Sequence, residues 1–146
     1  MVAAATSASN ATLPASIKVA KGLKIPEKIY GFTLPFGATI NMDGLAVTFG
    51  VMSIFVANLY GLEITLPLLL QFVFLGVALS LGTAGARGAD IVMMTILIST
   101  LGLPLEVVAV YATVSPFVDM GNTVANIAGD HTATALVASR FGDKEN

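Results

Sequence analysis

The hydrophobic residues are gathered into long uncharged runs that short polar turns separate. Residues 45–60 and 64–81 contain no charged side chain, and a third, shorter run covers 91–105. A helix needs about 17 to 25 mainly apolar residues to cross the hydrocarbon core of a bilayer. The pattern therefore predicts an all-α membrane protein.

The first long run belongs to a helix that we expect to break near its middle. Pro35 and Gly37, followed by Asn41 and Gly44, interrupt the helical pattern of residues 29–61. Proline removes a backbone donor, and sharp kinks in helices form at such positions. The helix is expected to resume after the break and to end near residue 61.

The next two runs favour a re-entrant hairpin rather than two full spans. The glycine-rich sequence GTAGARGAD, residues 82–90, follows the first run and carries Arg87 and Asp90, and the run after it is short for a full span. Irregular backbone at membrane depth is tolerated only where protein or a water-filled cavity covers it. We expect residues 62–103 to form this hairpin, with its turn inside the membrane.

The remaining segments lie at the two ends of the chain. In residues 1–28, Pro14 is expected in the first turn of a short helix that continues to about Lys21, and a basic loop follows. Residues 104–146 are expected to form a last transmembrane helix and a tail, with His131 near the end of that helix.

Charge predicts the orientation in the membrane. A group of lysines precedes the broken helix: Lys18, Lys21, Lys24 and Lys28. Arg140 and Lys144 lie at the end of the chain, whereas the loops near Glu63 and Glu106 carry no basic residue. Loops that face the cytoplasm are enriched in Lys and Arg. We therefore expect an integral membrane protein with both basic ends, including the C-terminus, in the cytoplasm.

Composition narrows the functional classes. Hydrophobic residues make up 55% of the chain and charged residues 11%, whereas about a quarter of a soluble domain is charged. Cysteine is absent, which excludes disulfides and thiolate metal sites. The basic residues form no extended patch beyond the lysine group, so nucleic acid is not an expected partner.

An enzyme is not expected either. His131 is the single histidine, and no cysteine or evident serine partner accompanies it. An intramembrane aspartyl protease could use Asp43 with Asp119, but the chain has no GxGD motif.

A polar stripe marks the last helix. Asp119, Asn122 or Thr123, Asn126 and Asp130 recur every three or four residues, which places them on one helical face. A charged side chain at the bilayer centre costs at least ~2.5 to 3.5 kcal/mol, so such residues usually face an ion or substrate path. For Asn122 and Thr123, hydrogen bonding between helices remains an equal alternative.

Carboxylates buried in a membrane without basic partners require cations to balance their charge. Asp43 and Asp130, the amide oxygens of Asn41 and Asn126, and carbonyls freed at the helix break offer the oxygen ligands that sodium prefers. Broken helices expose backbone groups to ions in this way in secondary transporters. We therefore predict a sodium site at the break.

Four motifs, taken with their order and spacing, carry a resemblance to a known family: SNATLP (9–14), PFGATINMDG (35–44), LSLGTAGARGAD (79–90) and VDMGNTVANIAGD (118–130). The chain resembles, over essentially its whole length, the C-terminal half of the dicarboxylate/amino acid:cation symporter family, the glutamate transporter homologues. The resemblance implies a sodium-coupled elevator transporter in a bacterial-type inner membrane, usually a homotrimer, with an amino acid bound between two helical hairpins. Protons are an alternative coupling ion.

The resemblance also implies that this chain starts at the tip of the first hairpin. The N-terminal half of the transporter, including the trimer scaffold, would then be missing, and Met1 would be a truncation or fragment start. The alternative is a fragment without transport activity.

The resemblance implies cation ligands by position. One sodium site would use Gly37, Asn41, Asn126 and Asp130. A second would use Thr39 with the carbonyls of Ser80, Leu81 and Thr83. A third would include Asn41 and Asp43.

It likewise implies the contacts of the amino acid. Asp119 would bind the ammonium group, with carbonyls near Ser7 and Ala86. Asn126 and the backbone amide of Ser9 would bind the α-carboxylate, and Thr123 would bond to the same head group.

Departures from the family pattern bear on specificity. Asn122 stands where acidic-substrate members have an arginine, and Leu45 stands where they have a threonine. A buried carboxylate without partners is costly, so we expect a neutral or polar amino acid. Arg87 and Asp90 leave alternatives open: they could pair with each other, Arg87 could anchor an acidic amino acid or dicarboxylate, or Asp90 could favour a cationic or hydroxylated substrate.

Overall fold

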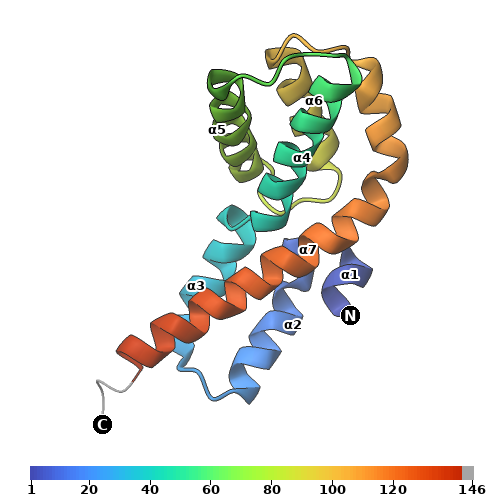
Figure 1. Cartoon of the computed structure of the whole chain (residues 1–146). Coiled ribbons are helices and arrows are strands. Elements are labelled where there is room, and N and C mark those ends of the chain that lie inside the picture. The colour runs from blue at the N-terminus through green and yellow to red at the C-terminus, as the bar shows by residue number, and fades with distance from the viewer. Residues whose placement is uncertain (143–146) are drawn as a thin grey trace.

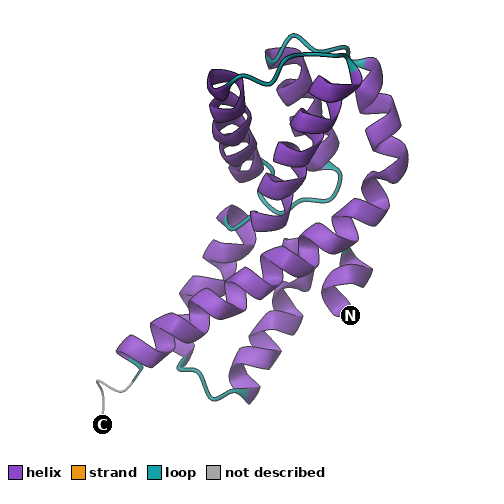
Figure 2. Cartoon of the chain, in the orientation of Figure 1, coloured by secondary structure: helices purple, strands orange, loops and turns teal. Residues whose placement is uncertain are grey.

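The computed structural model describes residues 1–142 and is helical throughout this part, as predicted. The elements are α1 (Val2–Thr6), α2 (Ser9–Gly22), α3 (Glu27–Ile40), α4 (Asp43–Leu59), α5 (Leu66–Gly82), α6 (Ala89–Thr100) and α7 (Glu106–Phe141). Figure 2 shows helices joined by short loops. Lys144, used above for orientation, lies outside the described residues.

α7 is the longest helix, and most of the other helices contact it. It runs diagonally across the molecule, with α2 and α3 beside one half and α4 and α6 beside the other (Figure 1). The helix changes direction in its first half, where Pro116 lies inside it. An internal proline removes a helical hydrogen bond and is a common cause of such kinks.

α3 and α4 are the two halves of the broken helix. The interruption falls at Asn41–Met42. Pro35 was expected to contribute to the break but lies inside α3. Proline costs a helix one backbone hydrogen bond, and a helix that stays packed against its neighbours can bear that loss. Residues 27–59 form the one stretch within the described part whose length and hydropathy suffice to cross a membrane.

α5 and α6 form a helical hairpin whose turn covers residues 83–88. The turn is shorter than predicted, since Gly82 ends α5 and Asp90 lies in the first turn of α6. Several large apolar side chains of α5 are exposed, among them Leu66, Leu70 and Phe74.

The first segment also differs from expectation. α2 begins at Ser9, so Pro14 lies inside that helix and not in its first turn. A short helix, α1, precedes it, and Ser7 between the two has a left-handed backbone conformation with φ 47°. His131 was expected near the end of the last helix but lies within α7, which continues to Phe141.

The main hydrophobic core lies between α4, α6 and α7. Phe49, Leu97, Ile98 and Tyr111 are among its buried members. A smaller cluster, built on Tyr30 and Leu34, joins α2 to α3.

Gly44 allows the close crossing of α4 and α7. A Cβ at this position would lie 2.6 Å from the backbone of Asn122, too close for any side chain. We predict that Gly44→Ala lowers the free energy of unfolding by about 1–3 kcal/mol, because overpacking forces the two backbones apart. The midpoint of thermal unfolding in detergent measures this effect.

Gly50→Ala is the matched control. Gly50 lies in the same helix, and a Cβ there would meet nothing within 4 Å. Since alanine favours helix by up to about 1 kcal/mol over glycine, this variant should be as stable as the wild type or more so. Equal destabilisation by both substitutions would contradict the close-crossing explanation.

Candidate functional site

The broken helix is joined to α7 by side chains at the break. The Asn41 amide nitrogen donates to Oδ1 of Asp130 at 3.0 Å and to the backbone carbonyl of Asn126 at 3.3 Å. Gly37 packs directly on the Asp130 carboxylate, since a Cβ at Gly37 would overlap it. The structure thus brings together Gly37, Asn41, Asn126 and Asp130.

Asn126 connects this group to the first turn of α4. Its side-chain oxygen accepts a hydrogen bond from the Gly44 backbone amide at 2.9 Å, and its nitrogen contacts the Met42 sulfur at 3.3 Å. The first N–H groups of a helix have no partner within the helix. Asn126 therefore satisfies one such group.

Asp43 lies on the other side of the break. Asn41 and Asp43 both face Gly129, where an added Cβ would lie 2.5 Å from each side chain. Asp43 is exposed and lines a groove of about 310 Å³ with Val47 and Thr48. The pair predicted for a third cation site is therefore adjacent, and Asp43 is accessible from outside the chain.

The residues predicted for a second cation site make hydrogen bonds within their own segments. The Thr39 hydroxyl donates to the Pro35 carbonyl at 3.0 Å, and the Thr83 hydroxyl donates to the Ser80 carbonyl at 2.6 Å. α3 and α5 are in contact, which brings the two segments into the same region. Leu81, the remaining member, is exposed.

The groups near the break that could bind a cation are oxygen ligands. Residues 1–142 contain no group of three or more His, Cys, Asp and Glu side chains able to hold a metal ion. At Asp130 a single buried carboxylate is surrounded by an amide and by backbone. Carboxylate, amide and carbonyl oxygens suit hard cations rather than soft metals.

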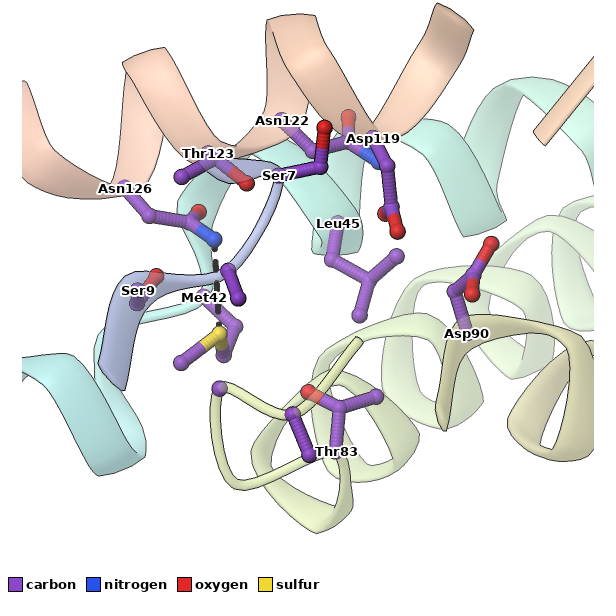
Figure 3. A pocket seen from close by; sticks show the side chains of 13 residues that line it. Ser7, Ser9, Met42, Leu45, Thr83, Asp90, Asp119, Asn122, Thr123 and Asn126 are labelled. Carbon is purple, nitrogen blue, oxygen red and sulfur yellow. Dashed lines mark hydrogen bonds between the residues drawn. The ribbon is translucent and has the colours of Figure 1, made fainter. Parts of the chain in front are cut away.

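A small cavity lies between the α1–α2 junction, the α5–α6 turn and α7 (Figure 3). Its volume of about 20 Å³ accommodates roughly one water-sized particle. All the residues predicted to bind substrate except Arg87 line it: Ser7, Ser9, Leu45, Ala86, Asp90, Asp119, Asn122, Thr123 and Asn126. In Figure 3 the carboxylate of Asp119 points towards Leu45 and Asp90.

Hydrogen bonds join the region of the α1–α2 junction to the α5–α6 turn beside this cavity. The Asn10 side chain donates to the Ala84 carbonyl at 2.8 Å, and the Arg87 guanidinium donates to the Thr6 carbonyl. Gly85, with φ +64°, lies so close to the Ala38 carbonyl that a Cβ would overlap it. Asn10 was not identified from the sequence as a site residue, because its partner is far away in the chain.

Arg87 and Asp90 have different partners and do not follow the expected alternative of pairing with each other. Arg87 is exposed and lines a second cavity, of about 450 Å³, which shares Asp119 with the small one. Asp90 is 2% exposed and faces the small cavity.

Two α7 hydroxyls hold Asp90. Its Oδ2 accepts hydrogen bonds from the Tyr111 hydroxyl at 2.8 Å and from the Ser115 hydroxyl at 2.7 Å. Neither residue was identified as functional from the sequence. The signal was present, since Tyr111, Ser115 and Asp119 recur every four residues on one helical face.

Asn122 offers the cavity a neutral amide. Its side-chain oxygen accepts a hydrogen bond from the Thr48 hydroxyl at 2.7 Å. Its amide nitrogen is buried without a hydrogen-bond partner in the described part of the chain. Thr48 was also missed from the sequence, because it is an isolated hydroxyl in a mainly apolar run.

Comparison with known protein families identifies relatives. The model of the Sodium:dicarboxylate symporter family matches residues 1–140. Excitatory amino acid transporter 3 of Mus musculus is 37% identical over 132 residues, which are 90% of this chain and 25% of that protein. Putative sodium-dependent excitatory amino acid transporter glt-4 of Caenorhabditis elegans is 36% identical over 138 residues, which are 94% of this chain and 28% of that protein.

Excitatory amino acid transporter 4 of Mus musculus, at 35% identity over 138 residues, covers 94% of this chain and 25% of its own length. The chain therefore spans about a quarter of the length of these curated relatives. The family consists of membrane transporters, not enzymes. The family match confirms the resemblance drawn from the motifs: this chain belongs to the sodium:dicarboxylate symporter family.

Proposed function

We propose that this chain forms the substrate- and cation-binding part of a sodium-coupled symporter of neutral or polar amino acids. The observation that carries the proposal is the cavity between the two turns and α7. It is lined by the half-buried carboxylate of Asp119, the apolar Leu45 and the neutral amide of Asn122. Family membership supports the coupling to sodium.

The sodium-binding role rests mainly on Asp130. This carboxylate is 2% exposed, and its hydrogen-bond partner is the neutral amide of Asn41. Burying a carboxylate is costly unless a charge compensates it. A sodium ion beside Asp130 supplies that charge, and Asn41 and Asn126 add further oxygen ligands. Protons remain the alternative coupling ion.

The amino acid head group would lie between Asp119 and the start of α2. Asp119 is suited to an ammonium group, helped by backbone carbonyls near Ser7 and Ala86. The Ser9 amide lies in the first turn of the 14-residue α2, where unpaired N–H groups and the helix dipole favour an anion. Asn126 and Thr123 complete the proposed contacts of the α-carboxylate end.

The side-chain subsite favours neutral substrates. An acidic side chain would face Leu45 and the Asn122 amide, neither of which supplies a positive charge. Arg87, the candidate acidic anchor, donates to Thr6 and lines the neighbouring cavity, which shares Ser7 and Asp119 with the small one. A carboxylate in this subsite would therefore gain a cationic partner only if Arg87 left Thr6 and turned into the small cavity.

The α5–α6 turn is proposed to act as a gate. At about 20 Å³ the cavity is too small for an amino acid, so the turn must move to admit one. The re-entrant position of this hairpin, the elevator movement, the homotrimer, the N-terminal half and the inner-membrane location remain proposals that rest on the family resemblance.

Replacement of Asp130 by Asn tests the cation site. Removing a buried charged ligand costs about 2 kcal/mol or more, so the sodium concentration for half-maximal uptake should rise about 30-fold or more. The measurement is sodium-dependent uptake of labelled alanine into proteoliposomes containing the protein that carries this chain. Glu63→Gln, the same chemical change at an exposed position, should have no effect. An unchanged sodium dependence in Asp130→Asn would show that the site is assigned wrongly.

Alanine substitutions in the turn test the gate. Gly85→Ala would place a Cβ against the Ala38 carbonyl, so the turn could not close and the initial uptake rate should fall by about tenfold or more. Gly88→Ala is the control, because Gly88 also has positive φ, at +78°, but a Cβ there would meet nothing within 4 Å. Equal rates in the two variants would argue that residues 83–88 form an ordinary loop.

Competition between amino acids tests the specificity. Neutral amino acids should outcompete aspartate and glutamate, and a mismatch that leaves a buried polar group unpaired can reach ~10⁴-fold. Asn122→Arg, with Leu45→Thr, should shift the preference towards acidic substrates. Arg87→Ala should leave the wild-type preference unchanged. If the wild type prefers aspartate and Arg87→Ala loses that preference, Arg87 is the anchor and the neutral assignment is wrong.

A further inference from the structure

Asp90 is a buried carboxylate in which one oxygen accepts hydrogen bonds and the other has no partner in the described part of the chain. It lies in the first turn of α6 and is 2% exposed. Tyr111 and Ser115 both donate to Oδ2, at 2.8 Å and 2.7 Å. Oδ1 is buried and has no hydrogen-bond partner within residues 1–142.

The unpaired oxygen has a physical consequence. An ionised carboxylate is an acceptor only. A buried acceptor without a donor retains the full cost of its lost hydration. The α7 hydroxyls occupy Oδ2, and Asp90 lines the small cavity, so the cavity is the place from which a bound substrate would offer Oδ1 a donor.

Asp90 lines the same small cavity as Asp119. Ser115, which holds Asp90, precedes Asp119 by one turn of α7, and one turn is about 5.4 Å along a helix. An amino acid whose ammonium group binds Asp119 would therefore lie close to Asp90.

We infer that Oδ1 of Asp90 accepts a hydrogen bond from the side chain of the transported amino acid. The symporter would then select, among neutral and polar substrates, those whose side chain ends in an O–H or N–H donor. Tyr111 and Ser115 are positioning residues that keep Oδ1 directed to the cavity. This role of Asp90 rests on the proposed function and adds a substrate class to it.

A set of amino acids of equal shape tests the inference on the unmodified protein. Norvaline has no polar side-chain atom, homoserine has a hydroxyl, 2,4-diaminobutyrate has an ammonium group and O-methylserine has an acceptor only. Homoserine or 2,4-diaminobutyrate should inhibit labelled alanine uptake about 10- to 100-fold more strongly than norvaline, as expected for a hydrogen bond to a charged group. O-methylserine should gain no such advantage. Equal inhibition by all of them, or an advantage of O-methylserine alone, would overturn the inference.

Asp90→Asn then assigns the effect to this residue. The two α7 hydroxyls need an acceptor at the position of Oδ2, so the amide oxygen should take that place and the amide nitrogen should face the cavity. The preference is expected to invert, with O-methylserine gaining over norvaline and 2,4-diaminobutyrate losing. An unchanged ranking in this variant would overturn the role of Asp90.

Ser115→Ala provides a second variant that keeps the carboxylate. Loss of one hydroxyl should weaken the preference for donors without inverting it, whereas a purely structural serine would leave the ranking unchanged and would contradict the positioning role. Sodium-dependent uptake of alanine, which has no side-chain donor, tests the proposed function separately. If that uptake is present and the ranking is absent, the inference about Asp90 fails and the proposed function stands.

Discussion

The hydrogen bonds between the broken helix and α7 are the interaction on which the site depends. A helix that breaks among apolar residues leaves backbone groups without partners, and in such surroundings each must be satisfied by protein or water. Here the side chain of Asn126, on α7, accepts a hydrogen bond from the Gly44 amide at the start of α4. The side chain of Asn41, at the end of α3, donates to the Asn126 carbonyl and to Asp130, so the contacts that join the break to α7 also bring the proposed oxygen ligands together.

Glycine makes this arrangement compact enough to function. At Gly37, Gly44 and Gly129 an added Cβ would collide with α7, or with side chains that reach across to it. Short distances between backbones bring carbonyl, amide and carboxylate groups close together. The same helix, α7, carries Asp119 in the small cavity, and its long continuous course holds both groups in fixed relation.

The sequence predicted the helical class, the break, two helices joined by a glycine-rich turn, and the polar stripe, because each depends on a local pattern of apolar runs, glycine, proline and helical spacing. It did not identify two residues that the structure adds to the site, Asn10 and Thr48. Asn10 and Thr48 act through residues that are distant in the chain. Helix boundaries near Pro14 and Asp90 were also misplaced, since tertiary packing can carry a helix through a proline or begin one directly after a glycine turn.

Asn126 takes part in both halves of the site. Its backbone carbonyl accepts from Asn41 beside Asp130, while its side chain lines the cavity that contains Asp119. Asn126 is buried and its side chain is bonded to the Gly44 amide, so a change in its position on one side would be felt on the other. If the proposed cation and amino acid sites are right, occupancy of one would therefore alter the affinity of the other, and by thermodynamic linkage the effect would be mutual.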